Sequence, residues 1–247
     1  MIKRRIGFST GAISKGDFLS ALEILRNTSI RAIELSALRL HELEPLVKAI
    51  PELELGRYEF VSVHAPSSFN RTNESFVVRL LRNVTNLGYP VIVHPDVIYD
   101  PTAWRILGDL LYIENMDQRK STGRTRQELT ETFTLLPAAK LCFDAGHARN
   151  VDTSMSQAVA ILEVFKERLA QVHLSTVNSL GHHEPFTFSA IHAFAELSDL
   201  IPQDVPIILE SPILREQIES EAALAELVLS SQNQSLVAKK IGVSPHF

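Results

Sequence analysis

Eight short runs of apolar and β-branched residues recur along the chain, and their repetition is the strongest constraint on its fold. The runs cover residues 4–9, 31–36, 60–65, 91–95, 109–115, 140–145, 169–175 and 206–211. Most are too uniformly apolar to leave one face in water, which is typical of strands buried on both faces of a sheet. Stretches with helical spacing lie between them, for example at residues 17–27, 74–88, 126–136, 156–169 and 221–231. The alternation predicts parallel strands joined by helices.

Eight such units in 247 residues predict a single (β/α)8 TIM barrel of the α/β class, with residues 1–247 in one domain. Only residues 95–108 are available between the fourth and fifth strands, so we expect a short helix there. Residues 235–247 are expected to add a helical turn or to remain a tail. An open, doubly wound sheet is the alternative. The G-x-G-x-x-G turn of its dinucleotide-binding versions is missing after the first strand, where the sequence reads FSTGAISKG.

The composition limits the classes of partner and the cellular compartment. A net charge of −5 gives no overall reason to expect nucleic acid or an anionic membrane as a partner. Cys142 is the only cysteine, so no disulfide can form within the chain, and its place in LCF indicates a small buried hydrophobe. No run approaches the ~18 apolar residues of a membrane span. We therefore expect a cytoplasmic enzyme or binding protein without membrane contact, of undetermined oligomeric state.

Seven of the eight predicted strands end on a side chain that can bind a metal or transfer a proton. These side chains are Glu34, His64, His94, Glu114, Asp144, His173 and Glu210. In a TIM barrel the C-terminal ends of the strands meet at one mouth, so these side chains are expected to converge. Several carboxylates in a confined pocket repel one another unless cations neutralise them. Imidazole and carboxylate together suit zinc, manganese, iron or cobalt better than calcium, so the pattern predicts an open catalytic metal site.

The individual residues leave alternatives open. Asp144 and His147, in FDAGH, are either two ligands or a helix-capping aspartate and a surface histidine. His64 and His94 are either ligands or satisfied core histidines. Glu34 comes from an early strand and is expected to bind a substrate hydroxyl or an arginine instead of a metal.

Two loops add further candidates. In SLGHHEPFTF, the adjacent His182 and His183 cannot easily bind the same ion, so we expect at most one of them to be a ligand. One predicted loop carries a local basic rim, which consists of Arg119, Lys120, Arg124 and Arg126. Within this rim, Arg124 is the candidate for substrate binding. The remaining histidines are expected at the surface or in the tail: His41, His192 and His246.

With these residues in order, the chain resembles the xylose isomerase-like TIM barrels, which include endonuclease IV, the class-two apurinic/apyrimidinic endonuclease. The resemblance covers nearly the whole chain and is carried by IGFSTGA, SVHAP, VHPD, IENM, FDAGHA, VHLS, GHHE and IILESP. In sugar isomerases and epimerases of this superfamily, one divalent ion is held by residues that map onto Glu114, Asp144, His173 and Glu210. In endonuclease IV the site grows to three zinc ions, and the added histidines resemble His64, His94 and His147.

The resemblance implies two enzyme activities that differ in the number of metal ions. His64 and His94 favour a multinuclear hydrolase of phosphoester bonds, with two or three ions, expected to be zinc, and Glu114 shared between them. The alternative is a sugar or sugar-phosphate isomerase or epimerase with one ion, in which Glu114 and Glu210 would move a proton. A binding barrel without catalysis is a third hypothesis. The role of His147, ligand or substrate contact, separates the two enzymes.

Departures from the family pattern bear on the substrate. The resemblance implies that His183 is a metal ligand and leaves His182 to contact substrate. Gly181 stands where endonuclease IV has an aspartate ligand, so a third ion would lack that ligand unless His182 or Glu184 replaces it. Ser67 and Ser68 follow SVHAP, where endonuclease IV places an aromatic side chain against DNA. A small phosphorylated or sugar-like substrate therefore stands beside DNA as the expected partner.

Overall fold

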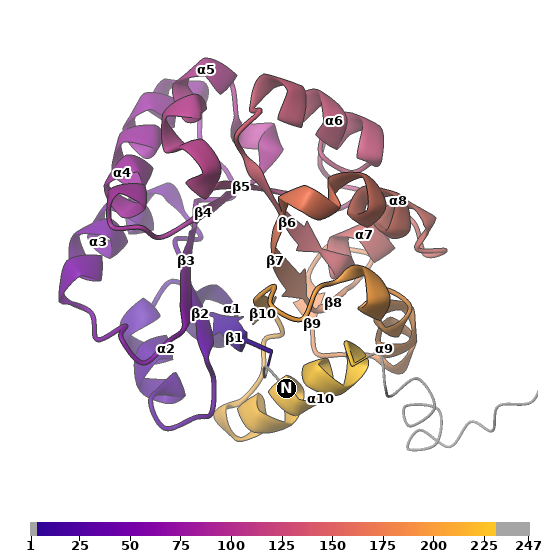
Figure 1. The fold of residues 1–247 in the computed structure, drawn as a ribbon. Coiled ribbons are helices and arrows are strands. Elements are labelled where there is room, and N and C mark those ends of the chain that lie inside the picture. The colour runs from indigo at the N-terminus through magenta and orange to yellow at the C-terminus, as the bar shows by residue number, and fades with distance from the viewer. Residues whose placement is uncertain (1–3, 231–247) are drawn as a thin grey trace, which may run out of the picture.

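Eight parallel strands form the centre of the fold. The computed structural model describes residues 4–230. The barrel strands are β1 (Ile6–Ser9), β2 (Ala32–Ser36), β3 (Phe60–His64), β4 (Val91–Val93), β5 (Leu111–Glu114), β6 (Lys140–Asp144), β7 (Leu169–Leu174) and β10 (Ile207–Leu209). They close into a barrel in the order β1-β10-β7-β6-β5-β4-β3-β2, which Figure 1 shows end-on. The predicted (β/α)8 TIM barrel is confirmed.

Helices surround the barrel on its outer side (Figure 1). They are α1 (Thr10–Ser14), α2 (Phe18–Leu25), α3 (Leu40–Ala49), α4 (Glu74–Asn86), α5 (Pro101–Trp104), α6 (Arg126–Leu135), α7 (Ala145–Val151), α8 (Ser156–Phe165), α9 (Phe188–Ala195) and α10 (Ile218–Val228). As expected, the connection between β4 and β5 is short, with the four-residue α5 followed by a 3-10 segment at Arg105–Leu110. The predicted turn or tail at 235–247 lies outside the described residues.

The strands are buried on both faces, but the two faces differ in chemistry. In β2, Ile33 and Leu35 are fully buried and belong to the main hydrophobic cluster. Glu34 lies between them and points the other way, because successive strand residues face opposite sides of the sheet. It pairs in register with Ser62 of β3 and accepts a hydrogen bond from Gln171 of β7. The barrel interior below its mouth is therefore polar.

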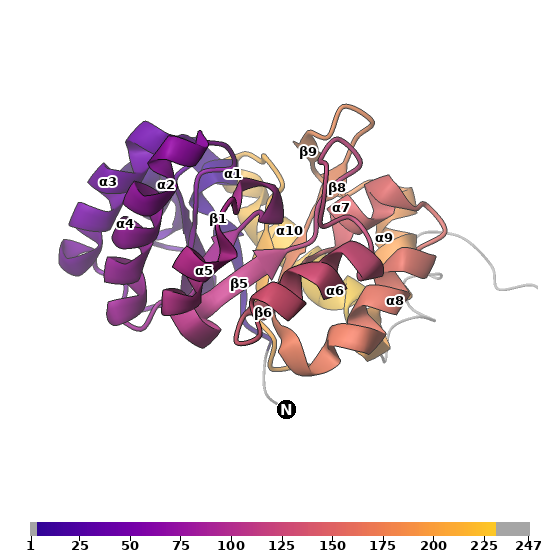
Figure 2. The same cartoon turned by 90° about the horizontal axis from the view of Figure 1, so that it is seen from above.

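A hairpin stands above the mouth on one side. Its short strands are β8 (Thr176–Val177) and β9 (His183–Glu184), which pair antiparallel. Figure 2 shows the hairpin projecting beyond one end of the barrel. The hairpin thereby brings residues that follow β7 over the C-terminal ends of the strands.

A buried carboxylate fixes the segment that follows His94. Glu74, the first residue of α4, is 5% exposed. Its Oε1 accepts hydrogen bonds from the backbone N–H groups of Tyr99 and Asp100, at 2.6 and 2.9 Å, and from the indole of Trp104 at 2.8 Å. These contacts tie the β4–α5 connection to α4. Among residues 4–230, no helix is both long and apolar enough to cross a membrane.

Candidate metal centre

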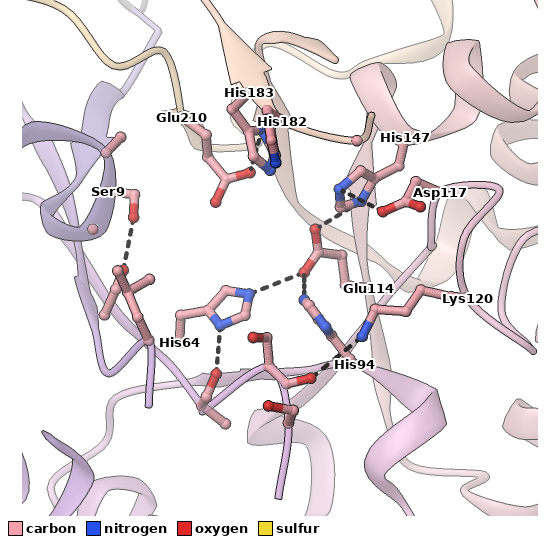
Figure 3. Close-up of a pocket in the computed structure, with 18 of the residues that line it drawn as sticks. Ser9, His64, His94, Glu114, Asp117, Lys120, His147, His182, His183 and Glu210 are labelled. Carbon is pink, nitrogen blue, oxygen red and sulfur yellow. Dashed lines mark hydrogen bonds and ion pairs between the residues drawn. The ribbon is translucent and has the colours of Figure 1, made fainter. Parts of the chain in front are cut away.

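A cavity of about 760 Å³ opens where the strands end, and most of the predicted site residues line it or lie at its floor. Its wall includes the last residues of several strands, helix α1, the loop after β5 and the β8–β9 hairpin. Figure 3 shows the histidines at the centre of this cavity, with Glu114 between them. The convergence expected from the strand ends is therefore present.

Glu114, the last residue of β5, uses both carboxylate oxygens. Its Oε2 lies 3.0 Å from Nε2 of His64 and 3.1 Å from Nε2 of His94. Its Oε1 lies 3.2 Å from Nδ1 of His173 and 3.3 Å from Nδ1 of His147. Each oxygen thus faces a different pair of imidazoles, which is the arrangement required of a carboxylate that bridges two cations.

Two groups of side chains share Glu114, and each could hold an ion. Within each group, one ligand atom per residue lies within 4.8 Å of every other. The first group comes from the ends of β3, β4 and β5 and consists of His64, His94 and Glu114. The second comes from β5, β6, β7 and the residue after β10 and consists of Glu114, Asp144, His173 and Glu210. The structure therefore places these side chains close together, in the two groups that the family resemblance implies.

A third set satisfies the same distance limit, namely Glu34, His64 and His173. Here the Nε2 of His173 donates a hydrogen bond to Oε2 of Glu34 at 2.9 Å, so that the opposite ring nitrogen, Nδ1, faces the centre. A carboxylate behind a histidine fixes which nitrogen carries the proton and orients the ring toward a metal. Glu34 thus supports His173 and lies outside the residues that line the cavity.

Asp144 both caps a helix and faces the centre. Its Oδ1 accepts a hydrogen bond from the backbone N–H of His147 at 2.6 Å, which begins α7. The side-chain amide of Asn115 bonds the backbone of Asp144 on both sides, at 2.7 and 2.8 Å, and so holds the end of β6 against β5. His147 is 3% exposed, so the alternative of a surface histidine is wrong.

The histidines of the first group differ in their protonation. Burial disfavours the charged form of His64, but its hydrogen bond to Glu114 and the charge of Glu34 outweigh burial and raise its pKa to about 9. Burial lowers the pKa of His94 to about 4, and the positive charges of His64 and Lys120 add to this effect. One histidine is therefore ready to bind a cation at neutral pH, whereas the other must first lose a proton.

Two carboxylate oxygens of the second group that lack a hydrogen bond indicate where a cation fits. Asp144 Oδ2 and Glu210 Oε2 are buried and make no hydrogen bond within residues 4–230, which is costly for a carboxylate. Burial raises the pKa of Asp144 to about 6, and the charges of Glu210 and Glu114 add to the effect. A divalent cation between these oxygens would offset the repulsion, so the residues fit a metal ion. The mixed imidazole and carboxylate donors suit zinc, manganese, iron or cobalt.

The hairpin brings its two histidines to the cavity in different ways. His183 Nδ1 lies 2.7 Å from Ser175 Oγ and 3.5 Å from Glu210 Oε2, and its ring centroid is 5.3 Å from that of His147. His182 is exposed and lines the cavity beside it. Glu184 instead accepts a hydrogen bond from Asn178 within the hairpin.

The structure places two predicted substrate contacts away from the cavity wall. Glu34 is fully buried beneath the centre. Arg124 uses its guanidinium on Glu128, four residues later, and does not line the cavity. The register between β2 and β3 explains the position of Glu34. His64, at the end of β3, pairs with Ser36 and not with Glu34, so Glu34 lies below the mouth of the barrel.

One carboxylate on the cavity wall was not predicted from the sequence. Asp117 is 1% exposed, and its Oδ2 lies 3.9 Å from His147 Nε2. It follows Glu114 by three residues, the same spacing that separates Asp144 from His147, so a signal was present. Lys120, which belongs to the predicted basic rim, lies on the same loop and lines the cavity (Figure 3). Its ammonium lies 2.8 Å from Asp96 Oδ2.

No protein-family model and no curated protein matches the sequence. Solved structures do match the fold. Endonuclease IV from Thermus thermophilus is 19% identical, with a TM-score of 0.60 over 90% of this chain and 97% of that one. The 3-keto-D-glucoside 4-epimerase from E. coli is 16% identical, with a TM-score of 0.51 over 91% of this chain and 98% of that one. A xylose isomerase-like TIM barrel protein from Mycobacterium smegmatis, in complex with magnesium, is 11% identical, with a TM-score of 0.57 over 93% and 100%. The chain therefore has the fold of the xylose isomerase-like TIM barrels.

Proposed function

We propose that this protein is a metal-dependent hydrolase that cleaves a phosphoester bond and holds at least two divalent ions, expected to be zinc. The observation that carries the proposal is the position of Glu114, whose two oxygens each belong to a different group of potential ligands. A site for one ion needs only the second group. The histidines of the first group, His64 and His94, then have no ligand role, although both turn Nε2 toward Glu114.

The residues divide the work as follows. His64 and His94 would hold one ion, Asp144, His173 and Glu210 the other, and Glu114 both. When bound, the ions would neutralise charge on the phosphate oxygens and polarise the reacting groups. Glu34 keeps Nδ1 of His173 available by accepting a hydrogen bond from Nε2–H. Ser9 and Lys120 line the same cavity and can donate hydrogen bonds to a substrate oxygen.

The substrate is expected to be either a small phosphorylated compound or DNA. The endonuclease IV neighbour makes a duplex with one abasic site the natural test for DNA. A chromogenic phosphodiester and phosphomonoester test the small-molecule case. Activity on the small esters with none on the duplex would favour the small substrate.

Removing a ligand of the first group alone tests the metal count. His94→Ala should lower the metal content by about one ion per chain, measured by elemental analysis, and should abolish phosphoester hydrolysis. His192→Ala is the matched control, because His192 is an exposed histidine of α9 outside the cavity. A single metal equivalent in the wild-type protein, or full hydrolysis by His94→Ala, would overturn the proposal.

The second candidate is a sugar isomerase or epimerase with one ion. It is favoured by the compact second group and by the burial of Glu210, which raises the pKa of that carboxyl and lets it carry a proton. In this reaction Glu114 and Glu210 would exchange protons with a carbon next to a carbonyl. Incorporation of solvent deuterium into a keto sugar, retained in His94→Ala, would support this candidate over the hydrolase.

A further inference from the structure

The loop after β5 places an arginine on the cavity wall with a fixed orientation. The Nε and Nη2 of Arg119 donate hydrogen bonds to the two carboxylate oxygens of Asp117 at 3.0 and 2.9 Å. Its Nη1 donates to the backbone carbonyl of Leu180, in the β8–β9 hairpin, at 2.9 Å. A long side chain on a loop is thus held from two sides, by a buried carboxylate and by the hairpin.

The hairpin has a glycine at the point where the guanidinium lies. Gly181 has a φ of +71°, a backbone conformation that favours glycine. A Cβ at this position would lie 2.0 Å from Nε and 2.1 Å from Cζ of Arg119. The guanidinium therefore occupies the space that any other side chain at 181 would need, and an aspartate cannot stand there while Arg119 keeps its place.

The remaining donors of Arg119 are available to a ligand in the cavity. A guanidinium has five N–H donors, and Asp117 and Leu180 take three of them. Arg119 lines the cavity together with His147 and Lys120. The ammonium of Lys120, on the same wall, is held by Asp96 Oδ2 at 2.8 Å and by the Ser67 carbonyl at 3.3 Å. This wall therefore carries two cationic side chains, each oriented by a carboxylate, whereas the floor is formed by the carboxylates of the metal groups.

We propose that Arg119, which packs against Gly181 and is oriented by Asp117, binds the phosphate group of the substrate. The N–H groups left on Nη1 and Nη2 can donate to phosphate oxygens, and such charge-assisted hydrogen bonds are about twice as strong as neutral ones. The choice of phosphate as the anion rests on the proposed function. The binding position itself rests on Arg119, Gly181 and the cavity.

Two substitutions test the proposal from opposite sides. Arg119→Ala removes the guanidinium, and Gly181→Ala keeps it but adds the Cβ that occupies its place. Binding of inorganic phosphate to the zinc-loaded protein is measured by isothermal titration calorimetry. Arg119→Ala should weaken phosphate binding about tenfold. Gly181→Ala should weaken it in the same direction, and Arg119→Lys should recover only part of the loss, because an ammonium does not reproduce the fork of donors.

Matched controls separate these effects from charge and from backbone strain. Arg126→Ala removes an exposed arginine of the neighbouring α6 that does not line the cavity, and it should leave phosphate binding within twofold. Gly88→Ala introduces a Cβ at a comparable φ of +87° with no atom within 4 Å, and it too should bind phosphate normally. If Gly181→Ala does not fold, the Arg119 variants decide the question.

Metal content, measured in the same samples, distinguishes this proposal from the proposed function. Arg119→Ala should keep the wild-type number of ions. Phosphate binding within twofold of wild type in Arg119→Ala, or a loss that only follows a loss of metal, would overturn the proposal. Phosphate binding that depends on Arg119 in a protein that hydrolyses no phosphoester would instead refute the hydrolase and leave the binding role of Arg119 in place.

Discussion

Glu34→Gln should weaken metal binding although Glu34 lies outside both groups of potential ligands. The fully buried Glu34 accepts hydrogen bonds at Oε2 from His173 Nε2 at 2.9 Å, from Gln171 Nε2 at 2.7 Å and from Ser62 Oγ at 3.3 Å. Glutamine keeps one acceptor oxygen but loses the negative charge. Nδ1 of His173 then becomes a weaker base, and the ring is less firmly oriented.

The expected loss of metal affinity follows from the hydrogen bond between Glu34 and His173. A hydrogen bond to a charged group contributes about 1.5–3 kcal/mol and a neutral one about 0.5–1.5 kcal/mol, so the change at His173 is about 1–1.5 kcal/mol. This corresponds to about a tenfold loss of affinity, at the lower end of the 10–100-fold range found for residues that orient metal ligands. Competition with a chromophoric chelator measures the zinc affinity.

Glu74→Gln is the control, since it makes the same chemical change in another buried carboxylate whose oxygen accepts three hydrogen bonds from α5 and the segment before it. It should lower the stability of the fold and leave the zinc affinity unchanged. Wild-type zinc affinity in Glu34→Gln, or an equal loss in Glu74→Gln, would refute the idea that Glu34 acts through His173.

Three further predictions use the protonation states and the burial. Zinc uptake at pH 8 should release protons, because the hydrogen bond to Glu114 and the charge of Glu34 raise the pKa of His64, a ligand of the first group, to about 9 in the metal-free protein. Titration calorimetry in buffers of different ionisation heat measures the release, and zinc uptake without proton release would contradict the prediction. Asp117→Asn should destabilise the fold at pH 7 by on the order of 2 kcal/mol. Burial opposes the charged form of Asp117, but the hydrogen bonds from Arg119 outweigh burial and hold the pKa of Asp117 at about 2, below the usual 3.8. The stability that the charged Asp117 contributes is therefore present above pH 3.8 and is lost as the pH falls toward 2. A difference in stability between wild type and Asp117→Asn, measured by urea unfolding, that stays constant from about pH 5 to about pH 2 would argue against this prediction. Cys142 is fully buried, and burial raises the pKa of its thiol. Cys142 should therefore react with a disulfide reagent only when the chain unfolds. Rapid labelling of the native protein would contradict this prediction.

The strand-end residues could be predicted from the sequence because closure of a parallel barrel brings them to one mouth. His64, Glu114 and Asp144 are each the last residue of a strand, and each lies where the rule places it. Glu34 shows the limit of the rule. It lies two residues before the end of β2, so it faces the interior beneath the mouth, and only the register of the sheet reveals this.

The loop residues were harder to predict because their roles depend on partners distant in sequence. Arg119 and Arg124 stand in the same basic loop, yet one contacts the hairpin 61 residues later and the other a glutamate four residues later. In the sequence, Gly181 indicates only that a ligand is missing. The fold shows that the guanidinium of Arg119 lies where a side chain at position 181 would be. Spacing along the chain cannot distinguish these outcomes.

The shared carboxylate of Glu114 also links two halves of the barrel. The first group of ligands comes from β3 and β4, the second from β6, β7 and the residue after β10, and β5 belongs to both. Occupancy by two ions would therefore act as a cross-link over the closed sheet and make the opening of one half dependent on the other. Metal loading should then appear as a gain in folding cooperativity, with amide hydrogen exchange slowing together in β3 and β7, strands that are not neighbours in the barrel.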